Sequence, residues 1–422
     1  MSEMSYLEKL LDGVEVEWKT LGKVLKRTKG TKITAGQMKA LHKDNAPLKI
    51  FAGGKTVAFV DFKDIPENDI NREPSIIVKS RGIIEFEYYD KPFSHKNEMW
   101  SYHSNNDAIS IKYIYYFLKI NEGYFQKIGG KMQMPQIATP DTDKFEVPIP
   151  CPDNPEKSLA IQSEIVRILD KFTELTAELT AELSMRKKQY NYYRDQLLSF
   201  DEEQEKPIYL EKLLDGVEVE WRTLGEIAVI YDGTHKTPKY TASGVPFVSV
   251  QNIKNLYGTN KYISPEDFKT YKNKPRKHDL FMTRIGDVGT CAIVEDDRPL
   301  AYYVTLALIR INQQIAVPGF IRYLIESRFG KAELYKRTLI HAVPMKINLG
   351  EIGKVAVPIP CPDNPEKSLA IQSEIVRILD KFDTLTNSIT EGLPREIELR
   401  QKQYEYYRDL LFSFPKPETV SN

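Results

Sequence analysis

Three short stretches carry residue types that occur in catalytic or phosphate-binding sites. Gly54–Thr56 supplies the Gly-Lys-Thr end of a phosphate-binding loop, but Lys49 stands where that loop requires its first glycine. Glu17–Lys19 has the Glu-x-Lys spacing of metal-dependent nucleases, yet a second copy of this stretch ends in Arg222. Asn154–Glu156 lacks the second proline and the aromatic residue of an adenine methyltransferase loop. With six scattered histidines and no Ser/His/Asp arrangement, the sequence shows no self-contained catalytic motif.

A polar, basic loop in the second half of the chain has the donors that DNA phosphates and base edges accept. The candidate contacts are Thr234, His235, Lys236, Thr237 and Lys239. A basic run at 272–278 offers further phosphate contacts at Lys274, Arg276 and Lys277. An ordinary solvated loop and a solvated basic face are the alternatives for these two stretches.

Two arginines stand at the ends of apolar, strand-like runs. Arg284 lies in FMTRIGDVG, and Arg81 lies in a comparable place in IIVKSRGII. An arginine at a strand end can donate two hydrogen bonds to guanine or can pair with a nearby carboxylate, and both remain open. The segment GGKMQMPQ adds Lys131, Gln133 and Gln136 as candidate DNA contacts.

Internal repeats organise the chain and must be settled before local structure is predicted. Val147–Phe172 and Val357–Phe382 are identical, and Tyr6–Gly22 differs from Tyr209–Gly225 at one position. The segments between them, roughly 23–146 and 226–356, show no comparable similarity. The sequence therefore predicts two unlike modules mounted on two like arms.

Charge follows the same division, although the net charge of the whole chain is zero. Residues 23–146 hold 20 Lys and Arg against 15 Asp and Glu, and residues 226–356 hold 19 against 12. Basic modules on acidic arms fit a polyanion bound by the modules and protein partners bound by the arms.

Both arms are predicted to be long helices that pair as a coiled coil. Each starts with Asp-Asn-Pro-Glu, which offers an N-cap at Asp153 or Asn154, with Glu156 completing a capping box if Asp153 is the cap. Apolar residues then recur at alternating spacings of four and three. They are Ile161, Ile165, Ile168, Phe172, Leu175 and Leu179 in the first arm, and Ile371, Ile375, Ile378, Phe382, Leu385 and Ile389 in the second. Gly392 and Pro394 predict a kink or break in the second arm.

The modules show short apolar runs bounded by Gly, Pro and Asp, which predict mixed α/β domains of a shared fold. Predicted strands are 49–52, 56–62, 75–78 and 83–89, then 245–250, 279–284, 291–294 and 302–311; predicted helices are 108–120 and 320–334. The resulting domains are the repeated segment 1–22, the first module 23–152, the first arm 153–206, the repeated segment 207–225, the second module 226–362 and the second arm 363–422.

The bulk sequence excludes several classes of protein. No apolar run approaches the ~20 residues of a membrane span, and the N-terminus lacks a secretory signal layout. Three cysteines without C-x-x-C spacing give neither a disulfide framework nor a zinc site. We therefore expect a cytoplasmic protein without contact to a membrane.

Two heptad arms in one chain can pair antiparallel, with one module at each end and a pseudo-two-fold axis between them. Such modules would approach a duplex as dimeric regulators approach palindromes. Because the modules differ in sequence, the recognised DNA site is expected to be split and asymmetric.

The order of variable module, long helix, variable module and long helix resembles the specificity subunit of type I restriction–modification systems. The IVRILDKF helices and the TAEL tandem at Thr176–Leu183 resemble one subclass closely. Asp232–Ile253 is similar to a recurrent opening of the family's target-recognition domains. The resemblance covers essentially the whole chain and is most specific in the arms.

The resemblance implies a non-catalytic subunit that binds double-stranded DNA and two modification subunits, which carry S-adenosylmethionine and methylate adenine. Restriction subunits, which use ATP and Mg, are implied as further partners, and no cofactor is implied for this chain. The helical spacer would set the unread gap between two half-sites. A coiled-coil scaffold that binds only proteins and a tandem DNA enzyme with a divergent active site are the competing interpretations.

Overall fold

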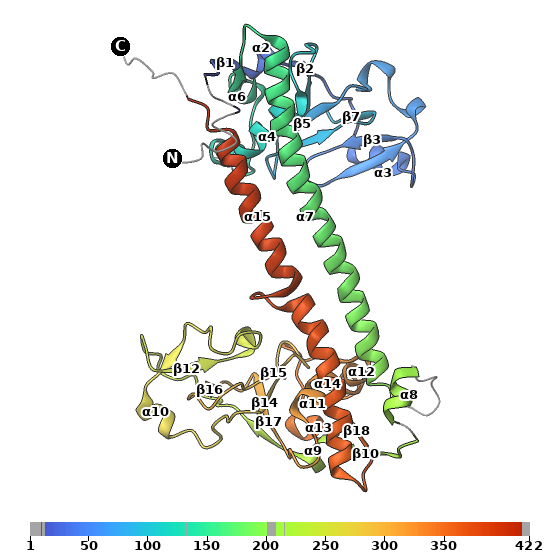
Figure 1. The fold of residues 1–422 in the computed structure, drawn as a ribbon, viewed down its shortest axis with the longest axis vertical. Coiled ribbons are helices and arrows are strands. Elements are labelled where there is room, and N and C mark those ends of the chain that lie inside the picture. The colour runs from blue at the N-terminus through green and yellow to red at the C-terminus, as the bar shows by residue number, and fades with distance from the viewer. Residues whose placement is uncertain (1–9, 11–12, 131–132, 201–207, 215, 416–422) are drawn as a thin grey trace. The chain divides into compact units, whose positions relative to one another are not determined.

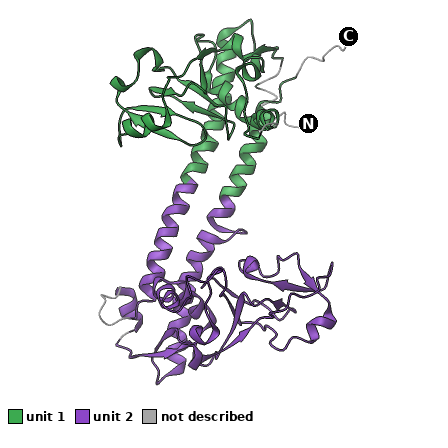
Figure 2. Cartoon of the chain, turned by 180° about the vertical axis from the view of Figure 1, so that it is seen from behind, with its two compact units in different colours: residues 1–178, 397–422 green, residues 179–396 purple. Residues whose placement is uncertain are grey.

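The computed structural model describes residues 10, 13–130, 133–200, 208–214 and 216–415. The chain forms two compact units, coloured separately in Figure 2. Unit 1 comprises residues 1–178 and 397–422, and unit 2 comprises residues 179–396. Each unit therefore contains one module and a part of both arms.

Unit 1 contains three small sheets (Figure 1). Two strands from the repeated segments, β1 and β9, pair antiparallel; the other sheets have the orders β2-β8-β5-β6 and β4-β3-β7, and β3 runs parallel to β7. The bounds are β1 Val16–Thr20, β2 Lys26–Thr28, β3 Leu48–Phe51, β4 Val57–Val60, β5 Ser75–Lys79, β6 Glu85–Tyr89, β7 Phe93–His95, β8 Trp100–His103 and β9 Glu146–Pro150.

Unit 2 repeats this arrangement strand for strand. Its sheets have the orders β10-β18, β11-β17-β14-β15 and β13-β12-β16, and β12 runs parallel to β16. The bounds are β10 Val219–Thr223, β11 Ala228–Asp232, β12 Val245–Val248, β13 Tyr262–Ile263, β14 Leu280–Thr283, β15 Cys291–Ile293, β16 Ala301–Tyr302, β17 Leu306–Ile311 and β18 Ala356–Pro360. The two unlike modules share one topology, as the sequence predicts.

Helices connect these sheets to the arms. In unit 1, α4 packs on β5 and β6, and in unit 2, α11 packs on β15 and on the arm helix α14. The bounds are α2 Leu21–Val24, α3 Ala35–Leu41, α4 Ile111–Ile120, α5 Glu122–Gly129, α6 Thr139–Asp143, α7 Pro155–Leu197, α8 Ile208–Leu214, α9 Leu224–Ile227, α10 Pro265–Lys269, α11 Pro318–Glu326, α12 Arg328–Tyr335, α13 Leu349–Ile352, α14 Pro365–Asn387 and α15 Gly392–Leu411. None of the helices in the described ranges has both the length and the apolar character that a membrane span requires.

Most predicted module elements are present, with three kinds of difference. The strands predicted from the longer apolar runs correspond to β3, β4, β5, β6, β12, β14 and β15. The predicted strand 302–311 is two strands, β16 and β17, and the predicted helix 320–334 is interrupted at Ser327, whose hydroxyl caps α12 by accepting from Gly330 N at 3.1 Å. The sequence did not predict β2, β7 and β8, because their residues KRT, FSH and WSYH do not form an apolar run.

Both arm helices start at the predicted Pro, and asparagine is the cap in each. Asn154 Oδ1 accepts a hydrogen bond from Lys157 N at 3.0 Å, and Asn364 Oδ1 accepts from Lys367 N at 3.0 Å. Asp153 is therefore not the cap, and the capping box with Glu156 does not form. Pro155 occupies the first turn, where its missing N–H has no helical acceptor.

The arm helices use two faces. Ile161 and Ile165, predicted as seam positions, are fully buried within the hydrophobic core of unit 1, and Ile371 and Ile375 lie in the corresponding core of unit 2. The seam is formed by half-buried residues and tyrosines further along each arm. Phe172 stacks on Tyr407 in unit 1, and Phe382 stacks on Tyr190 and Tyr193 in unit 2, so the paired segments run antiparallel within each unit.

The predicted break in the second arm lies between α14 and α15. Gly392 has a φ of +80°, and a Cβ atom there would lie 2.4 Å from Thr384 O, so only glycine fits. Pro394 falls in the first turn of α15, where its missing donor is tolerated. The seam prediction for Ile389 is wrong, because this residue lies in the break with 74% of its surface exposed.

Identical arm residues hold the two unlike modules. Gln162 accepts from Ser110 N at 2.9 Å and donates to Ala108 O at 3.0 Å. In unit 2, the repeat-equivalent Gln372 accepts from Val317 N at 2.9 Å and donates to Ile315 O at 3.1 Å. About two helical turns further along each arm, Asp170 accepts from the Tyr116 hydroxyl in unit 1, and Asp380 accepts from the Tyr323 hydroxyl in unit 2. The like arms therefore fix the orientation of each module through the same bonds.

Candidate nucleic-acid interface

In unit 1, three loops meet at one edge of the module, and we call them the unit 1 loop cluster (residues 29–34, 80–83 and 133–137). Thr31 N donates to His95 O at 2.7 Å, which ties the loop after β2 to the end of β7. The turn after β5 joins the returning segment through a β-bridge between Arg81 and Gln136 and a 2.9 Å bond from Gly82 N to Pro135 O. The structure thus brings the predicted contacts Arg81 and Gln136 together, and both are exposed.

Unit 2 builds the same cluster from different residues (the unit 2 loop cluster, residues 232–240, 284–287 and 338–347). Thr234 N donates to Tyr302 O at 3.2 Å, as Thr31 does to His95. Ile285 forms a β-bridge with Lys346, and Gly286 N donates to Met345 O at 2.9 Å. Gly82 and Gly286 both adopt positive φ, 74° and 85°, which keeps the two turns in the same conformation.

Matching the hydrogen bonds of the two clusters shows which residues of unit 1 and unit 2 correspond, and this correspondence differs from the one that the sequence suggested. Arg81 corresponds to Ile285, Gln136 corresponds to Lys346, and Ser80, rather than Arg81, corresponds to Arg284, because Ile137 N bonds Ser80 O and Ile347 N bonds Arg284 O, each at 3.0 Å. The comparable positions that the sequence suggested for Arg81 and Arg284 are therefore one residue out of register.

Arg284 is buried and paired with a carboxylate. Its side chain is 7% exposed, Nη2 donates to Asp232 Oδ1 at 2.7 Å, and Nη1 donates to Ile347 O at 3.3 Å. Of the two alternatives open for Arg284, the structure favours the carboxylate pair and not a direct contact with guanine. Its role is to position the cluster.

The loop after β11 presents its candidate residues to solvent. His235 Nε2 lies 2.8 Å from Asp232 Oδ2, so the carboxylate that pairs with Arg284 also orients the exposed His235 ring. Lys236, Thr237 and Lys239 are exposed, and Thr234 is half-buried at the base of the loop. A Cβ atom on Gly233 would lie 2.4 Å from Tyr303 O, so glycine is needed for this close approach.

Only the start of the basic run at 272–278 lies beside this cluster, where Tyr271 contacts Thr234. Lys274 Nζ lies 4.9 Å from the Phe268 ring centroid, and Lys274 O accepts from Arg310. Arg276 and Lys277 precede the first residue of β14, at the opposite end of that strand from Arg284. Lys131 lies outside the described residues, and Gln133 is exposed beside Gln136.

Sequence reasoning missed Thr31, Lys32 and Lys346. A detectable signal existed for the first two, because Gly30-Thr31-Lys32 follows its strand as Gly233-Thr234-His235 follows β11. Lys346 has no local signal, since only its bridge to Ile285 places it in the cluster.

Many cations of the arms are neutralised within their own helix. Arg167, Lys171, Arg186, Arg377 and Lys402 each pair with a glutamate on their own helix. By contrast, within the described ranges, no carboxylate forms an ion pair with the exposed cluster cations Lys32, Arg81, Lys236, Lys239 and Lys346. Unneutralised cations gathered on one edge of each module are what a polyanion requires.

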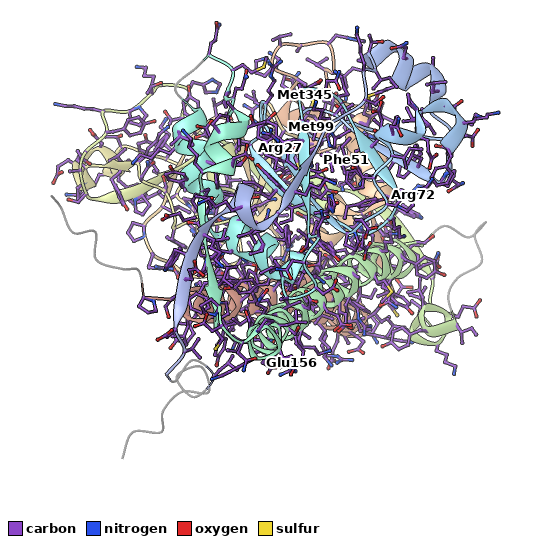
Figure 3. All side chains as sticks on the ribbon, turned by 90° about the horizontal axis from the view of Figure 1, so that it is seen from above. Arg27, Phe51, Arg72, Met99, Glu156 and Met345 are labelled. Atoms are coloured by element: carbon purple, nitrogen blue, oxygen red, sulfur yellow. The ribbon has the colours of Figure 1, made fainter. Side chains whose placement is uncertain are left out.

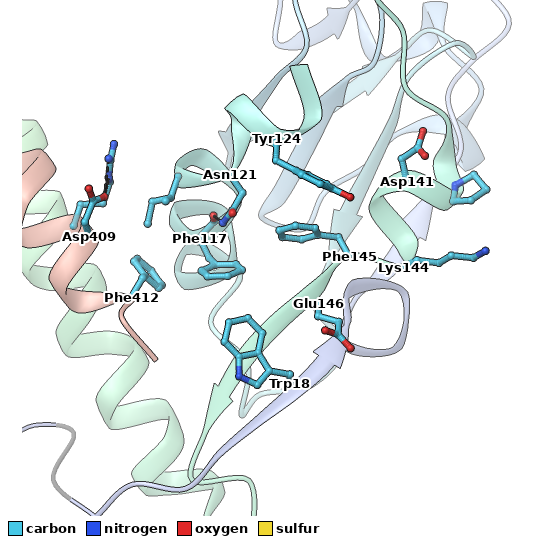
Figure 4. Close-up of a pocket in the computed structure, with 13 residues that line it drawn as sticks. Trp18, Phe117, Asn121, Tyr124, Asp141, Lys144, Phe145, Glu146, Asp409 and Phe412 are labelled. Atoms are coloured by element: carbon cyan, nitrogen blue, oxygen red, sulfur yellow. Dashed lines mark hydrogen bonds and ion pairs between the residues drawn. The ribbon is translucent and has the colours of Figure 1, made fainter. Parts of the chain in front are cut away.

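A cavity of about 890 Å³ lies elsewhere in unit 1 (Figure 4). Trp18, Phe117 and Phe412 line it, together with charged residues that include Lys144 and Asp409. The repeat equivalents of Trp18 and Asp409 in unit 2 are Trp221 and Asp195, and both have partners there. The Phe329 ring packs on Trp221 with 5.4 Å between the ring centroids, and Arg328 N donates to Asp195. Over the residues that the structure describes, no group of His, Cys, Asp or Glu has the geometry of a metal site.

Comparisons with known proteins agree with this arrangement. Residues 14–185 and 216–399 match the family model of the type I restriction modification DNA specificity domain. The chain is 41% identical over 444 residues to the EcoR124I/EcoR124II specificity subunit of Escherichia coli, with complete coverage of both chains. It is also 36% identical over 420 residues to the EcoprrI specificity subunit of Escherichia coli, covering 93% of each chain.

A solved structure, the S subunit of a type I restriction–modification system from M. genitalium, shares the fold. The TM-score is 0.59 at 16% identity, and the match covers 98% of this chain and 100% of that one. Matching loops on matching frames, a match to the family model over both halves and full-length relatives lead to one conclusion. The chain belongs to the family of type I restriction–modification specificity subunits, which recognise a DNA target and are not themselves catalytic.

Proposed function

We propose that this chain reads a two-part, asymmetric site in double-stranded DNA, one half with each loop cluster. The observation that carries the proposal is that the two clusters share their backbone bonds and differ in their exposed side chains. At matching positions, unit 1 offers the exposed Arg81 and Gln136, whereas unit 2 offers the half-buried Ile285 and the exposed Lys346. A common frame with different side chains is suited to reading two different half-sites.

We infer that the chain works with two modification subunits and with restriction subunits. S-adenosylmethionine, ATP and Mg belong to those partners in this proposal, and this chain binds none of them. The arms provide candidate docking faces, because Tyr192 and Tyr406 are exposed at equivalent places on α7 and α15. The Trp18 cavity is a second candidate face. Three free cysteines fit the cytoplasm as the place of assembly.

Single-molecule sequencing of methylated adenines tests the proposal. The chain is produced with its modification subunits in a host that lacks other adenine methyltransferases, once as the wild type and once with residues 23–146 replaced by another module. The expected result is a split motif of which only one half changes. A change in both halves would contradict the assignment of one half-site to each module.

The chain purified alone and its assembled complexes test the competing functions. A tandem DNA enzyme would methylate or cut DNA as the purified chain alone. A scaffold that binds only proteins would give complexes without sequence preference in a DNA-binding selection.

A further inference from the structure

The unit 2 loop cluster ends in an exposed apolar tip, residues 339–345, with the sequence LIHAVPM. Val343 is 100% exposed, and Leu339, Ile340 and Met345 are 49%, 41% and 36% exposed. Figure 3 labels Met345 among the side chains of the molecule. Several large apolar side chains within seven residues form a patch that marks a binding surface rather than a scattered exposure.

The tip is a fixed hairpin. Leu339 pairs with Lys346 across it, with Leu339 N donating to Lys346 O at 2.8 Å, and Ala342 N donates to Leu339 O at 3.2 Å. Ile285 pairs with the other edge of Lys346. The Arg284 guanidinium bonds Ile347 O and thereby connects the base of the hairpin to Asp232. Because these bonds already fix the conformation of the tip, it loses little conformational entropy when it binds a ligand.

The surroundings of the tip are cationic. Lys346 ends the hairpin, His341 stands exposed within it, and Lys236 and Lys239 lie on the neighbouring loop of the cluster. Asp232 is neutralised by Arg284. An apolar tip with such a border is complementary to DNA, which offers phosphates around its grooves and apolar groups within them.

The matching segment of unit 1 is more polar. Before Gln136 it carries Gln133, Met134 and Pro135, where unit 2 carries Val343, Pro344 and Met345 before Lys346. The two units differ here in the chemistry that a base edge would meet. Amide side chains bond base edges, whereas valine, isoleucine and methionine contact only apolar groups.

We propose that residues 339–345 enter the major groove of the second half-site and pack on the 5-methyl groups of thymine. The tip is a narrow turn closed by the single bridge between Leu339 and Lys346, and the thymine methyl is the apolar group exposed in the major groove. This inference rests on the proposed function, since it names a contact of the same DNA-reading cluster.

Uracil substitution tests the inference directly. The complex of the full chain with its modification subunits is titrated with a duplex containing the methylated motif, and thymines of either half-site are replaced by deoxyuridine. For the wild type, affinity should fall about four-fold per contacted methyl in the second half-site, the equivalent of ~0.8 kcal/mol per carbon. Substitution in the first half-site serves as the internal reference.

Two variants complete the experiment. Val343→Ser with Ile340→Ser should abolish the sensitivity to uracil, and Val229→Ser, an exposed valine of β11 outside the cluster, should retain it. Equal affinity of the wild type for thymine and uracil duplexes overturns the inference, as does a second half-site without an A·T pair. A duplex with 2-aminopurine in the second half-site reports unstacking of bases through increased fluorescence. An increase without sensitivity to uracil also overturns the inference, because the tip would then unstack bases.

Failure of the tip variant to assemble with modification subunits, while Val229→Ser assembles, would assign the tip to a protein contact and overturn the inference. Each of these outcomes leaves the split motif of the wild type intact. Absence of a split motif in the wild type would instead contradict the proposed function.

Discussion

The Asp232 carboxylate accepts a hydrogen bond from the buried Arg284 guanidinium at 2.7 Å and holds the exposed His235 ring with its other oxygen. Asp232→Ala leaves the Arg284 charge buried and unpaired, which should lower the free energy of unfolding of unit 2 by about 3 kcal/mol or more. Urea denaturation followed in the full chain measures the loss. Asp296→Ala removes the solvent-exposed pair with Arg298 and should change the stability much less, because water screens that pair. An equal loss of stability in the two variants would show that the buried Arg284 pair contributes no more than an exposed pair.

Lysines of the unit 2 loop cluster should account for part of the salt dependence of DNA binding. If Lys236 and Lys239 neutralise phosphates, each change to alanine should make the slope of log affinity against log salt less steep by about 0.9. The control is Lys402→Ala, because Lys402 pairs with Glu398 on α15. A series of binding titrations between low and moderate salt measures the slopes. A slope that changes with Lys402 and not with Lys236 would place the DNA on the arms.

His95 should make unit 1 sensitive to mild acid. The ring is fully buried, with Nε2 3.2 Å from Ser101 Oγ, and burial lowers its pKa from 6.5 to about 4. Since the unfolded chain binds this proton first, stability is fully present above pH 6.5 and is lost as the pH falls toward 4. The loss at the lower end should approach ~3 kcal/mol, at 1.36 kcal/mol per pKa unit.

Thermal unfolding between pH 7 and pH 4 measures this loss, and His95→Asn should flatten the dependence. The corresponding position in unit 2 is Tyr302, which does not titrate in this range, so unit 2 provides the comparison. An unchanged pH profile in the variant would contradict the assignment to His95.

Lengthening the TAEL stretch of α7 should lengthen the unread gap of the DNA site. One more four-residue unit adds ~6 Å of helix, nearly two base-pair rises of ~3.4 Å. Sequencing of methylated adenines should then report the same two half-sites at a greater separation. Changed half-sites with an unchanged gap would show that α7 contributes to reading and not to spacing.

The arms could be predicted from the sequence because their information is local. A repeated cap marks where both helices begin, and Gly392 marks the break in the second arm. The apolar period predicts the helices, although its first positions pack into the module cores instead of the seam. The modules were predicted in class and in their longer strands, because strands such as β5 carry a continuous apolar run. The site was harder. Arg284 and Arg81 look alike in sequence, but only Arg284 has Asp232 beside it, and 52 residues separate those two partners. Lys346 becomes a candidate only through its bridge to Ile285.

The bonds of Gln162 and Gln372 have a consequence for how new specificities can arise. On the module side, each amide meets only main-chain atoms, so this pair of bonds holds modules of different sequence, provided that each also offers one tyrosine and an apolar face for the buried arm isoleucines. A foreign module that presents these groups can be inherited whole without compensating changes in the helix that receives it. The contact between arm and module therefore does not depend on the origin of the module. The loops of the module can diverge in sequence without weakening that contact.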